Sequence, residues 1–174
     1  MPGHWEGDLV FGVRPSAVGT LVERHSRFLM LFALLDGYKA KQVRPALTRS
    51  VAGLPEHLRR SLTWDRGREM AEHAEFTVES GVQVYFCDPH SPRRRGSNEN
   101  TNGLFRQYLG KAEDLRKITQ PDLDLIADEL NGRPRKSLAW RTPAQALQQH
   151  LELVPSAASG PSEGDSAGGV ATTP

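Results

Sequence analysis

Short β-favouring runs fill the first part of the chain and are separated by turns. The first run, residues 4–13, places Asp8 among apolar and aromatic neighbours, and an Arg14-Pro15-Ser16 turn follows it. Residues 19–35 then predict two strands with a polar break at residues 24–27. Three strands joined by turns this short predict an antiparallel meander.

The remainder of the chain alternates helical and extended patterns. Val43, Leu47 and Val51 recur at helical spacing and predict a helix over residues 40–51 that ends at Gly53. The segments expected after it are, in order, a strand at 61–65, a helix at 68–80, a strand at 82–87, a helix beginning near Glu99, a helix at 122–130, and a last helix from Thr142-Pro143 to about Leu151.

The stretch from Tyr85 to Tyr108 places one acidic residue, Glu99, behind an arginine cluster and at the start of a helix. Ser97 or Asn98 is a suitable cap for that helix. One predicted face is polar and consists of Glu99, Asn102, Gly103 and Arg106. The opposite face consists of Thr101, Leu104, Phe105 and Tyr108. The polar face is therefore available for chemistry, while the opposite face packs on a core.

Composition predicts a single globular domain with a short tail. The chain has 174 residues, 37% hydrophobic and 25% charged, and no apolar run approaches the ~18 residues of a membrane span. The start has neither a basic nor an apolar targeting region, so we expect a cytoplasmic protein with no membrane partner. Residues 1–153 form the expected domain. Residues 154–174, rich in Gly, Ser, Ala and Pro without Lys or Arg, are typical of a disordered tail.

Charges are distributed in blocks, although the net charge is only +1. Residues 91–111 carry five basic residues and one acid, residues 112–130 carry six acids and two bases, and residues 131–141 carry four basic residues and no acid. Basic segments around an acidic site favour a phosphate-bearing partner. A solvated surface remains the alternative interpretation of any one block.

Three acids, Asp8, Asp65 and Glu99, lie in a strand, at the end of a strand and at the start of a helix. Hard oxygen ligands without Cys or His suit Mg²⁺ or Mn²⁺. Two such ions ~3.5–4 Å apart activate a water or hydroxyl and stabilise the leaving oxygen of a phosphodiester. However, the chain has 21 acidic residues, so spacing alone does not select this triple. Glu6 and Glu69 are rival ligands, and Glu6 shares a strand face with Asp8.

Five ordered segments carry a resemblance to a known family. They are HWEGD (4–8), TLVER (20–24), LTWDRGRE (62–69), DPHSPRRRGSNENTNGLFRQY (88–108) and LNGRPRKSLAWRTP (130–143). From Gly3 to about Leu151, the chain resembles the catalytic part of bacterial insertion sequence 30 family transposases. The resemblance implies an α/β, ribonuclease H-like fold as in retroviral integrases, with a mixed five-stranded sheet flanked by helices.

The resemblance also implies the chemistry. Asp8, Asp65 and Glu99 correspond to the family's acidic metal-binding triad, and the 33 residues between Asp65 and Glu99 agree with the family's pattern. The implied reaction is DNA cleavage at transposon ends, followed by attack of the freed 3′-hydroxyl on another phosphodiester. It uses two Mg²⁺ ions, with Mn²⁺ as a substitute, and no small-molecule organic cofactor. The expected partners are transposon-end and target DNA, with a homo-oligomer assembled on DNA.

Other residues are expected to contact DNA. Arg93, Arg94 and Arg95 are expected to follow the phosphates. A further group is expected to contact DNA or to orient Glu99, and consists of Asn98, Asn102 and Arg106. The basic turn at residues 133–136 is interpreted either as a DNA contact or as an ordinary surface turn. Trp64 is expected in the core.

Two features depart from the family's pattern. Arg66 stands where Asn or Gln is usual, and Arg93-Arg94 stand where Trp-Gln is usual. Family members also carry an amino-terminal helix-turn-helix region, which is absent from this sequence. Two functions are therefore kept: a DDE transposase catalytic domain, and a truncated, non-catalytic remnant that binds DNA or pairs with a full-length transposase. A structure-directed nuclease on the same fold is a third alternative.

Overall fold

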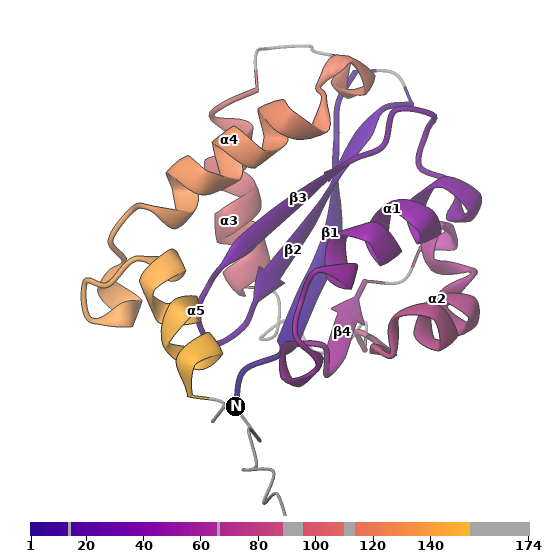
Figure 1. Cartoon of the computed structure of the whole chain (residues 1–174). Coiled ribbons are helices and arrows are strands. Elements are labelled where there is room, and N and C mark those ends of the chain that lie inside the picture. The colour runs from indigo at the N-terminus through magenta and orange to yellow at the C-terminus, as the bar shows by residue number, and fades with distance from the viewer. Residues whose placement is uncertain (14, 66, 89–95, 110–113, 154–174) are drawn as a thin grey trace, which may run out of the picture.

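The fold is organised by a five-stranded sheet with helices on both faces (Figure 1). The computed structural model describes residues 1–13, 15–65, 67–88, 96–109 and 114–153, and only the backbone of residues 96–98. The strands are β1 (His4–Phe11), β2 (Ala17–Glu23), β3 (Leu29–Ala33), β4 (Ser61–Trp64) and β5 (Gln83–Phe86). They are ordered β3-β2-β1-β4-β5.

The sheet is mixed, as expected. β1, β2 and β3 pair antiparallel and form the predicted meander, whereas β4 pairs parallel with both β1 and β5. Because a parallel neighbour needs a crossover connection, α1 (Ala40–Ala52) lies between β3 and β4, and α2 (His73–Ser80) lies between β4 and β5. The remaining helices follow the sheet and are α3 (Gly96–Arg106), α4 (Gln120–Asn131) and α5 (Pro143–Glu152).

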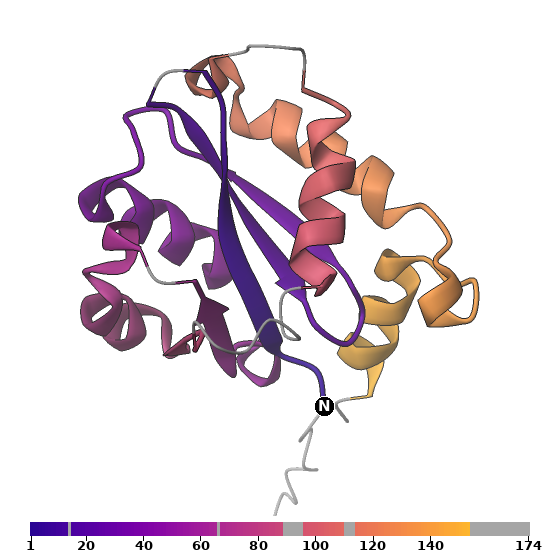
Figure 2. The same cartoon turned by 180° about the vertical axis from the view of Figure 1, so that it is seen from behind.

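Two hydrophobic clusters cover the two faces of the sheet. The first includes Leu47 of α1 and Phe76 of α2. The second includes Phe105 of α3 and Leu123 of α4. Figure 2 shows α3 in front of the sheet when the molecule is seen from behind. Trp64 is fully buried in the first cluster, which confirms its predicted place in the core.

Three helix boundaries differ from the sequence prediction. The predicted helix at 68–80 is divided into a short 3-10 turn at Arg68–Met70 and α2. α3 begins at Gly96, before Glu99. α4 begins at Gln120 because Thr119 and Asp122 form a reciprocal capping box with proline in the first turn. Among the described residues, no helix has both the length and the apolar character needed to cross a membrane.

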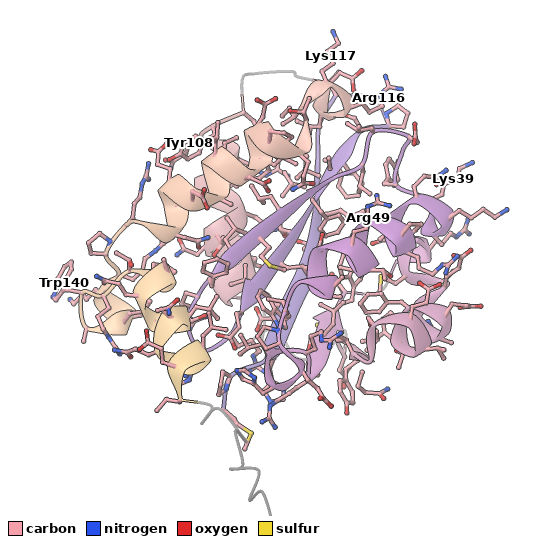
Figure 3. The ribbon with its side chains drawn as sticks, viewed as in Figure 1. Lys39, Arg49, Tyr108, Arg116, Lys117 and Trp140 are labelled. Carbon is pink, nitrogen blue, oxygen red and sulfur yellow. The ribbon has the colours of Figure 1, made fainter. Side chains whose placement is uncertain are left out.

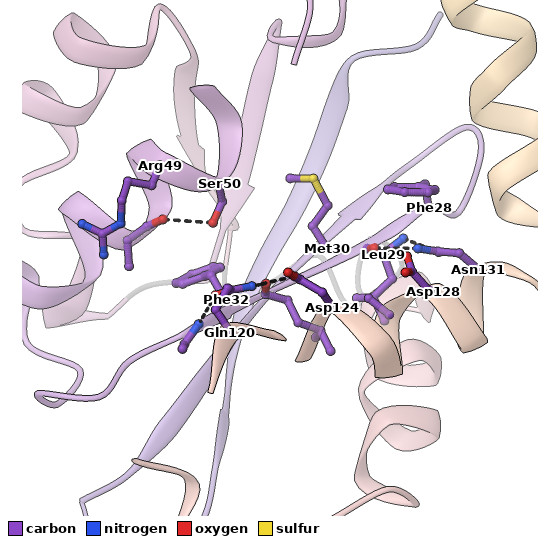
Figure 4. Close-up of a pocket in the computed structure, with 14 residues that line it drawn as sticks. Phe28, Leu29, Met30, Phe32, Arg49, Ser50, Gln120, Asp124, Asp128 and Asn131 are labelled. Atoms are coloured by element: carbon purple, nitrogen blue, oxygen red, sulfur yellow. Dashed lines mark hydrogen bonds between the residues drawn. The ribbon is translucent and has the colours of Figure 1, made fainter. Parts of the chain in front are cut away.

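Side chains of α4 cover the outer edge of β3. Asn131 accepts from Leu29 N and donates to Leu29 O, both at 2.8 Å. Gln120 donates to Leu31 O at 2.8 Å and accepts from Ala33 N at 2.9 Å. Beside them, a groove of about 410 Å³ lies between α1, β3 and α4 (Figure 4). The two amides thus pair peptide groups that an open sheet edge would offer to another chain.

A buried carboxylate, Glu23, fixes the start of β1 against the turn after β2. It is fully buried and accepts hydrogen bonds from Gly3 N at 3.0 Å and His25 N at 3.0 Å. It also accepts from Ser26 N at 2.6 Å and Ser26 Oγ at 2.7 Å. Four donors converging on one buried carboxylate make it a structural centre of the TLVER segment.

Replacing Glu23 tests this role. Glu23→Ala leaves four donors without their acceptor, so we expect the free energy of unfolding to fall by about 3 kcal/mol. Glu23→Gln keeps one acceptor oxygen and is expected to lose less. Urea denaturation measures both, with Glu56→Ala at an exposed position as the control. A Glu23→Ala chain as stable as the Glu56→Ala chain would contradict a structural role for Glu23.

Candidate catalytic site

The register between β1 and β4 brings two of the three predicted acids to neighbouring positions. Gly7 pairs with Trp64 in this parallel ladder, so Asp8 and Asp65 are the next residues on adjacent strands that run in the same direction. Gly7 is required there because a Cβ atom would lie 2.3 Å from the Trp64 ring. The buried Trp64 ring thus occupies the space beside β1 and helps to set the register on which this arrangement depends.

Asp8 is half-buried, and both of its carboxylate oxygens accept hydrogen bonds. Oδ1 accepts from Leu9 N at 2.8 Å, and Oδ2 accepts from Asn102 Nδ2 at 3.0 Å. Burial is the main cause that raises the pKa of Asp8 above its ordinary value, and repulsion from the Asp65 and Glu69 carboxylates raises this pKa further. A cation beside Asp8 would relieve this repulsion.

Asn102 connects α3 to β1. Its amide nitrogen donates to Asp8, while its Oδ1 is buried with no hydrogen-bond partner among the described residues. Asn102 was expected to contact DNA or to orient Glu99, and the structure places its amide on Asp8. One usable signal was present in the sequence, since the three-residue spacing of Glu99 and Asn102 puts both on one helix face.

Glu99 lies in the first turn of α3 and is exposed to solvent. It is therefore one helical turn before the residue that contacts Asp8. Within the part of the chain that the structure describes, no three acidic, histidine or cysteine side chains are gathered closely enough to hold a metal ion together. The structure thus brings Asp8 beside Asp65 and α3 onto β1, without gathering the three carboxylates into one cluster.

The two rival acids have other partners. Glu6 is buried and forms an ion pair with Arg24, with 3.2 Å between Oε1 and Nε. Glu69 accepts from the Trp64 indole N–H at 3.3 Å. Its carboxylate lies 2.1 Å from where a Cβ atom on Gly67 would be, so a side chain at that position would displace the Glu69 carboxylate. Glu69 still acts electrostatically on Asp8, whereas Glu6 is engaged with Arg24.

Most of the predicted DNA-contacting arginines lie outside the described residues. These are Arg93, Arg94 and Arg95, and the unusual Arg66 and the side chain of Asn98 are also outside them. Arg106 is exposed and donates from Nη1 to Phe11 O at 3.5 Å, at the end of β1. Of the polar face predicted for α3, Asn102 and Arg106 therefore both contact β1.

The strand order, with helices on both faces of the mixed sheet, is that of a ribonuclease H-like fold. The structure of the catalytic core domain of BIV integrase has the same fold, with a TM-score of 0.64 and 18% sequence identity. The similarity covers 87% of this chain and 98% of the integrase chain. The fold class expected from the sequence is thereby confirmed.

The profile of the integrase core domain family matches residues 1–92, so this chain belongs to that family. It is 53% identical over 152 residues to Transposase InsI for insertion sequence element IS30C of Escherichia coli (strain K12). It is 55% identical over the same length to the transposase for insertion sequence element IS1086 of Cupriavidus metallidurans. Each similarity covers 87% of this chain, which spans only 39% and 44% of those relatives. The resemblance to insertion sequence 30 family transposases is confirmed.

The raised pKa of Asp8 leads to a stability prediction. A carboxyl whose pKa is raised by folding favours the folded state below its ordinary value of 3.8, and this contribution is lost as pH rises through the raised value. At pH 7 without metal, Asp8→Asn is therefore expected to raise the melting temperature by about 1–3 °C, a small effect because Asp8 is partly solvated.

This difference should disappear near pH 3, where the parent carboxyl is also protonated. Thermal melts in EDTA at both pH values measure it, with the exposed Asp36→Asn as the matched control. A melting temperature lowered by Asp8→Asn at pH 7 would show that the Asp8 charge stabilises the metal-free chain, and would contradict the destabilising effect expected from its burial and from the neighbouring carboxylates.

Proposed function

We propose that the chain is a DDE transposase catalytic domain that cleaves DNA strands at insertion-sequence ends. The freed 3′-hydroxyl then attacks another phosphodiester, whose own 3′ oxygen leaves, so that the strand end is joined to new DNA. Asp8, Asp65 and Glu99 are the catalytic and metal-binding residues of the domain. The observation that carries this proposal is the register of β1 and β4, which puts Asp8 and Asp65 at adjacent positions beside α3, the helix of Glu99.

The residues at this site fit a hard divalent cation. The proposed ligands are all carboxylates, and the Asp8 carboxylate is repelled by that of Asp65. Oxygen donors of this kind suit Mg²⁺ or Mn²⁺ better than softer metals. Bound there, two such ions would neutralise the phosphodiester and activate a water or the 3′-hydroxyl. Glu99 would join the pair from α3.

The chain's own residues have separate tasks in this proposal. Asn102 holds Oδ2 of Asp8, so the carboxylate keeps its orientation before substrate arrives. Leu9 N holds the other oxygen of the same group. Such preorganisation reduces the rearrangement needed when the site acts. Arg93, Arg94 and Arg95 would follow the DNA phosphates, with Arg106 near the end of β1.

A second function is supported by a specific observation. The three carboxylates are not gathered into one cluster in the described residues. A chain in which they remained apart would bind DNA, or pair with a full-length transposase, without cleaving. DNA binding is common to both functions, so cleavage separates them.

A strand-cleavage assay on duplexes that carry candidate insertion-sequence ends tests the proposal. In Mg²⁺ or Mn²⁺ we expect cleavage by the parent, and a rate at least about a thousandfold lower for Asp65→Asn and for Glu99→Gln, because each removes one proposed metal ligand. DNA affinity in EDTA should be unchanged. Glu56→Gln, at an exposed position away from the site, is the matched control.

Two results of the cleavage assay would count against the proposed catalytic function. Equal cleavage by the parent and both variants would point to a contaminating nuclease and contradict the proposal. DNA binding without cleavage by any chain would favour the non-catalytic function.

A further inference from the structure

The loop between α4 and α5 is strongly basic. Residues 133–141, which we name the tryptophan loop, contain no acid. Its basic residues are Arg133, Arg135, Lys136 and Arg141. A loop with several basic residues and no acid attracts a polyanion, even though Glu129 of α4 pairs with Arg133 at its start. The catalytic carboxylates do not account for this loop, which lies on other elements.

Two residues of the tryptophan loop have strained backbone conformations. Ala139 and Trp140 are consecutive residues in the left-handed region, with φ of 53° and 65°. Residues other than glycine adopt this conformation only at an energetic cost, and such strain concentrates at functional sites. Backbone hydrogen bonds hold the loop closed, from Arg135 N to Arg141 O at 3.0 Å and from Trp140 N to Arg135 O at 2.9 Å.

The strained turn leaves a large aromatic ring in solvent. Trp140 is 69% exposed, whereas Trp5 and Trp64 are 2% and 0% exposed. In Figure 3, Trp140 lies at the periphery of the molecule, on the side away from Lys39. An exposed indole held out by a rigid, strained backbone is typical of a contact surface, because its apolar area otherwise remains in water at a cost.

The loop is also anchored to neighbouring parts of the protein. Arg133 donates to the hydroxyl of Tyr108, just after α3, and to Glu129 Oε1 at 3.1 Å. Its guanidinium group lies 5.6 Å from the centre of the Tyr108 ring. Arg141 donates to Gln149 of α5 and to Leu138 O. The loop is thus held against Tyr108, two residues after the helix that carries Glu99, and against α4 and α5, while Lys136 and Trp140 are exposed.

These observations point to a second nucleic-acid contact, and we propose that the tryptophan loop binds a DNA strand. The exposed Lys136 contacts the phosphates, and the Trp140 ring stacks on an unpaired base. Aromatic rings on a basic surface bind single-stranded nucleic acid in this way, without base-specific hydrogen bonds. The inference rests on the proposed function only in taking DNA as the substrate. A protein partner is disfavoured because the loop itself carries only basic charges.

Fluorescence anisotropy of a labelled duplex with a short single-stranded overhang, in EDTA, tests the loop apart from catalysis. We expect Trp140→Ala to weaken binding about tenfold because it removes the stacking ring, and Trp140→Phe to retain affinity within about threefold. Lys136→Glu should weaken binding and lower the slope of affinity against salt. With a blunt duplex, the effect of Trp140→Ala should be smaller.

Matched controls are available on other surfaces. Leu125→Ala removes another exposed apolar side chain, 70% exposed on α4, and Lys39→Glu reverses an exposed charge next to α1. Both should bind within about twofold of the parent. Emission from the buried Trp5 and Trp64 reports whether each Trp140 variant is folded.

The outcomes separate this inference from the proposed function. A Trp140→Ala chain that binds as tightly as Leu125→Ala overturns the inference, even if Asp65-dependent cleavage is observed. Trp140-dependent binding in a chain that never cleaves supports the inference while the catalytic proposal fails. Loss of self-association in Trp140→Ala, measured by sedimentation with DNA affinity unchanged, would show instead that the loop contacts a second copy and would also overturn the inference.

Discussion

The parallel pairing of β1 with β4 is the contact on which the candidate site depends. Its register is set where the absence of a side chain at Gly7 leaves room for the buried Trp64 ring. Each residue that follows this pair is an aspartate, so the same packing that completes the core places Asp8 beside Asp65. A one-residue change of register would send the alternating side chains to the other face and separate them.

The surroundings of Asp8 orient its carboxylate but disfavour its negative charge. Asp8 is half-buried and repelled by neighbouring carboxylates, yet Asn102 and Leu9 N hold both of its oxygens. This environment is unfavourable for an isolated charge and favourable for a charge that binds a cation. α3 can lie across β1 at this point because Phe105, three residues after Asn102, packs in the second hydrophobic cluster, which includes Val10 of β1.

Local sequence patterns predicted much of the fold. The apolar runs within residues 4–13 and 19–35 predicted the meander because they are short and bounded by polar turns. The start of α4 was placed too late, although the capping box of Thr119 and Asp122 can be read from the sequence. The predicted helix over residues 68–80 was partly wrong, since residues 68–70 form a separate 3-10 turn. In that turn Glu69 contacts the Trp64 indole, a contact that helical spacing does not reveal.

Local sequence patterns predicted the candidate site less well than the fold. Asp8, Asp65 and Glu99 were selected by a family resemblance, since spacing among many acids does not choose them. The hydrogen bond between Asn102 and Asp8 joins residues 94 positions apart, and the role of Glu23 depends on donors from two separate segments. Contacts of this range follow from the tertiary arrangement, which helical and strand periodicities do not contain.

The assignment of the metal site is tested most sharply by a Mn²⁺ titration of the chain, followed by water-proton relaxation, with and without a short DNA duplex. We expect binding by the parent, and its loss in Asp65→Asn and Glu99→Gln. Glu6→Gln, which alters a nearby acid engaged with Arg24, should bind as the parent does. Equal Mn²⁺ binding by all four chains, or loss only in Glu6→Gln, would contradict the assignment of Asp8, Asp65 and Glu99 as the metal site.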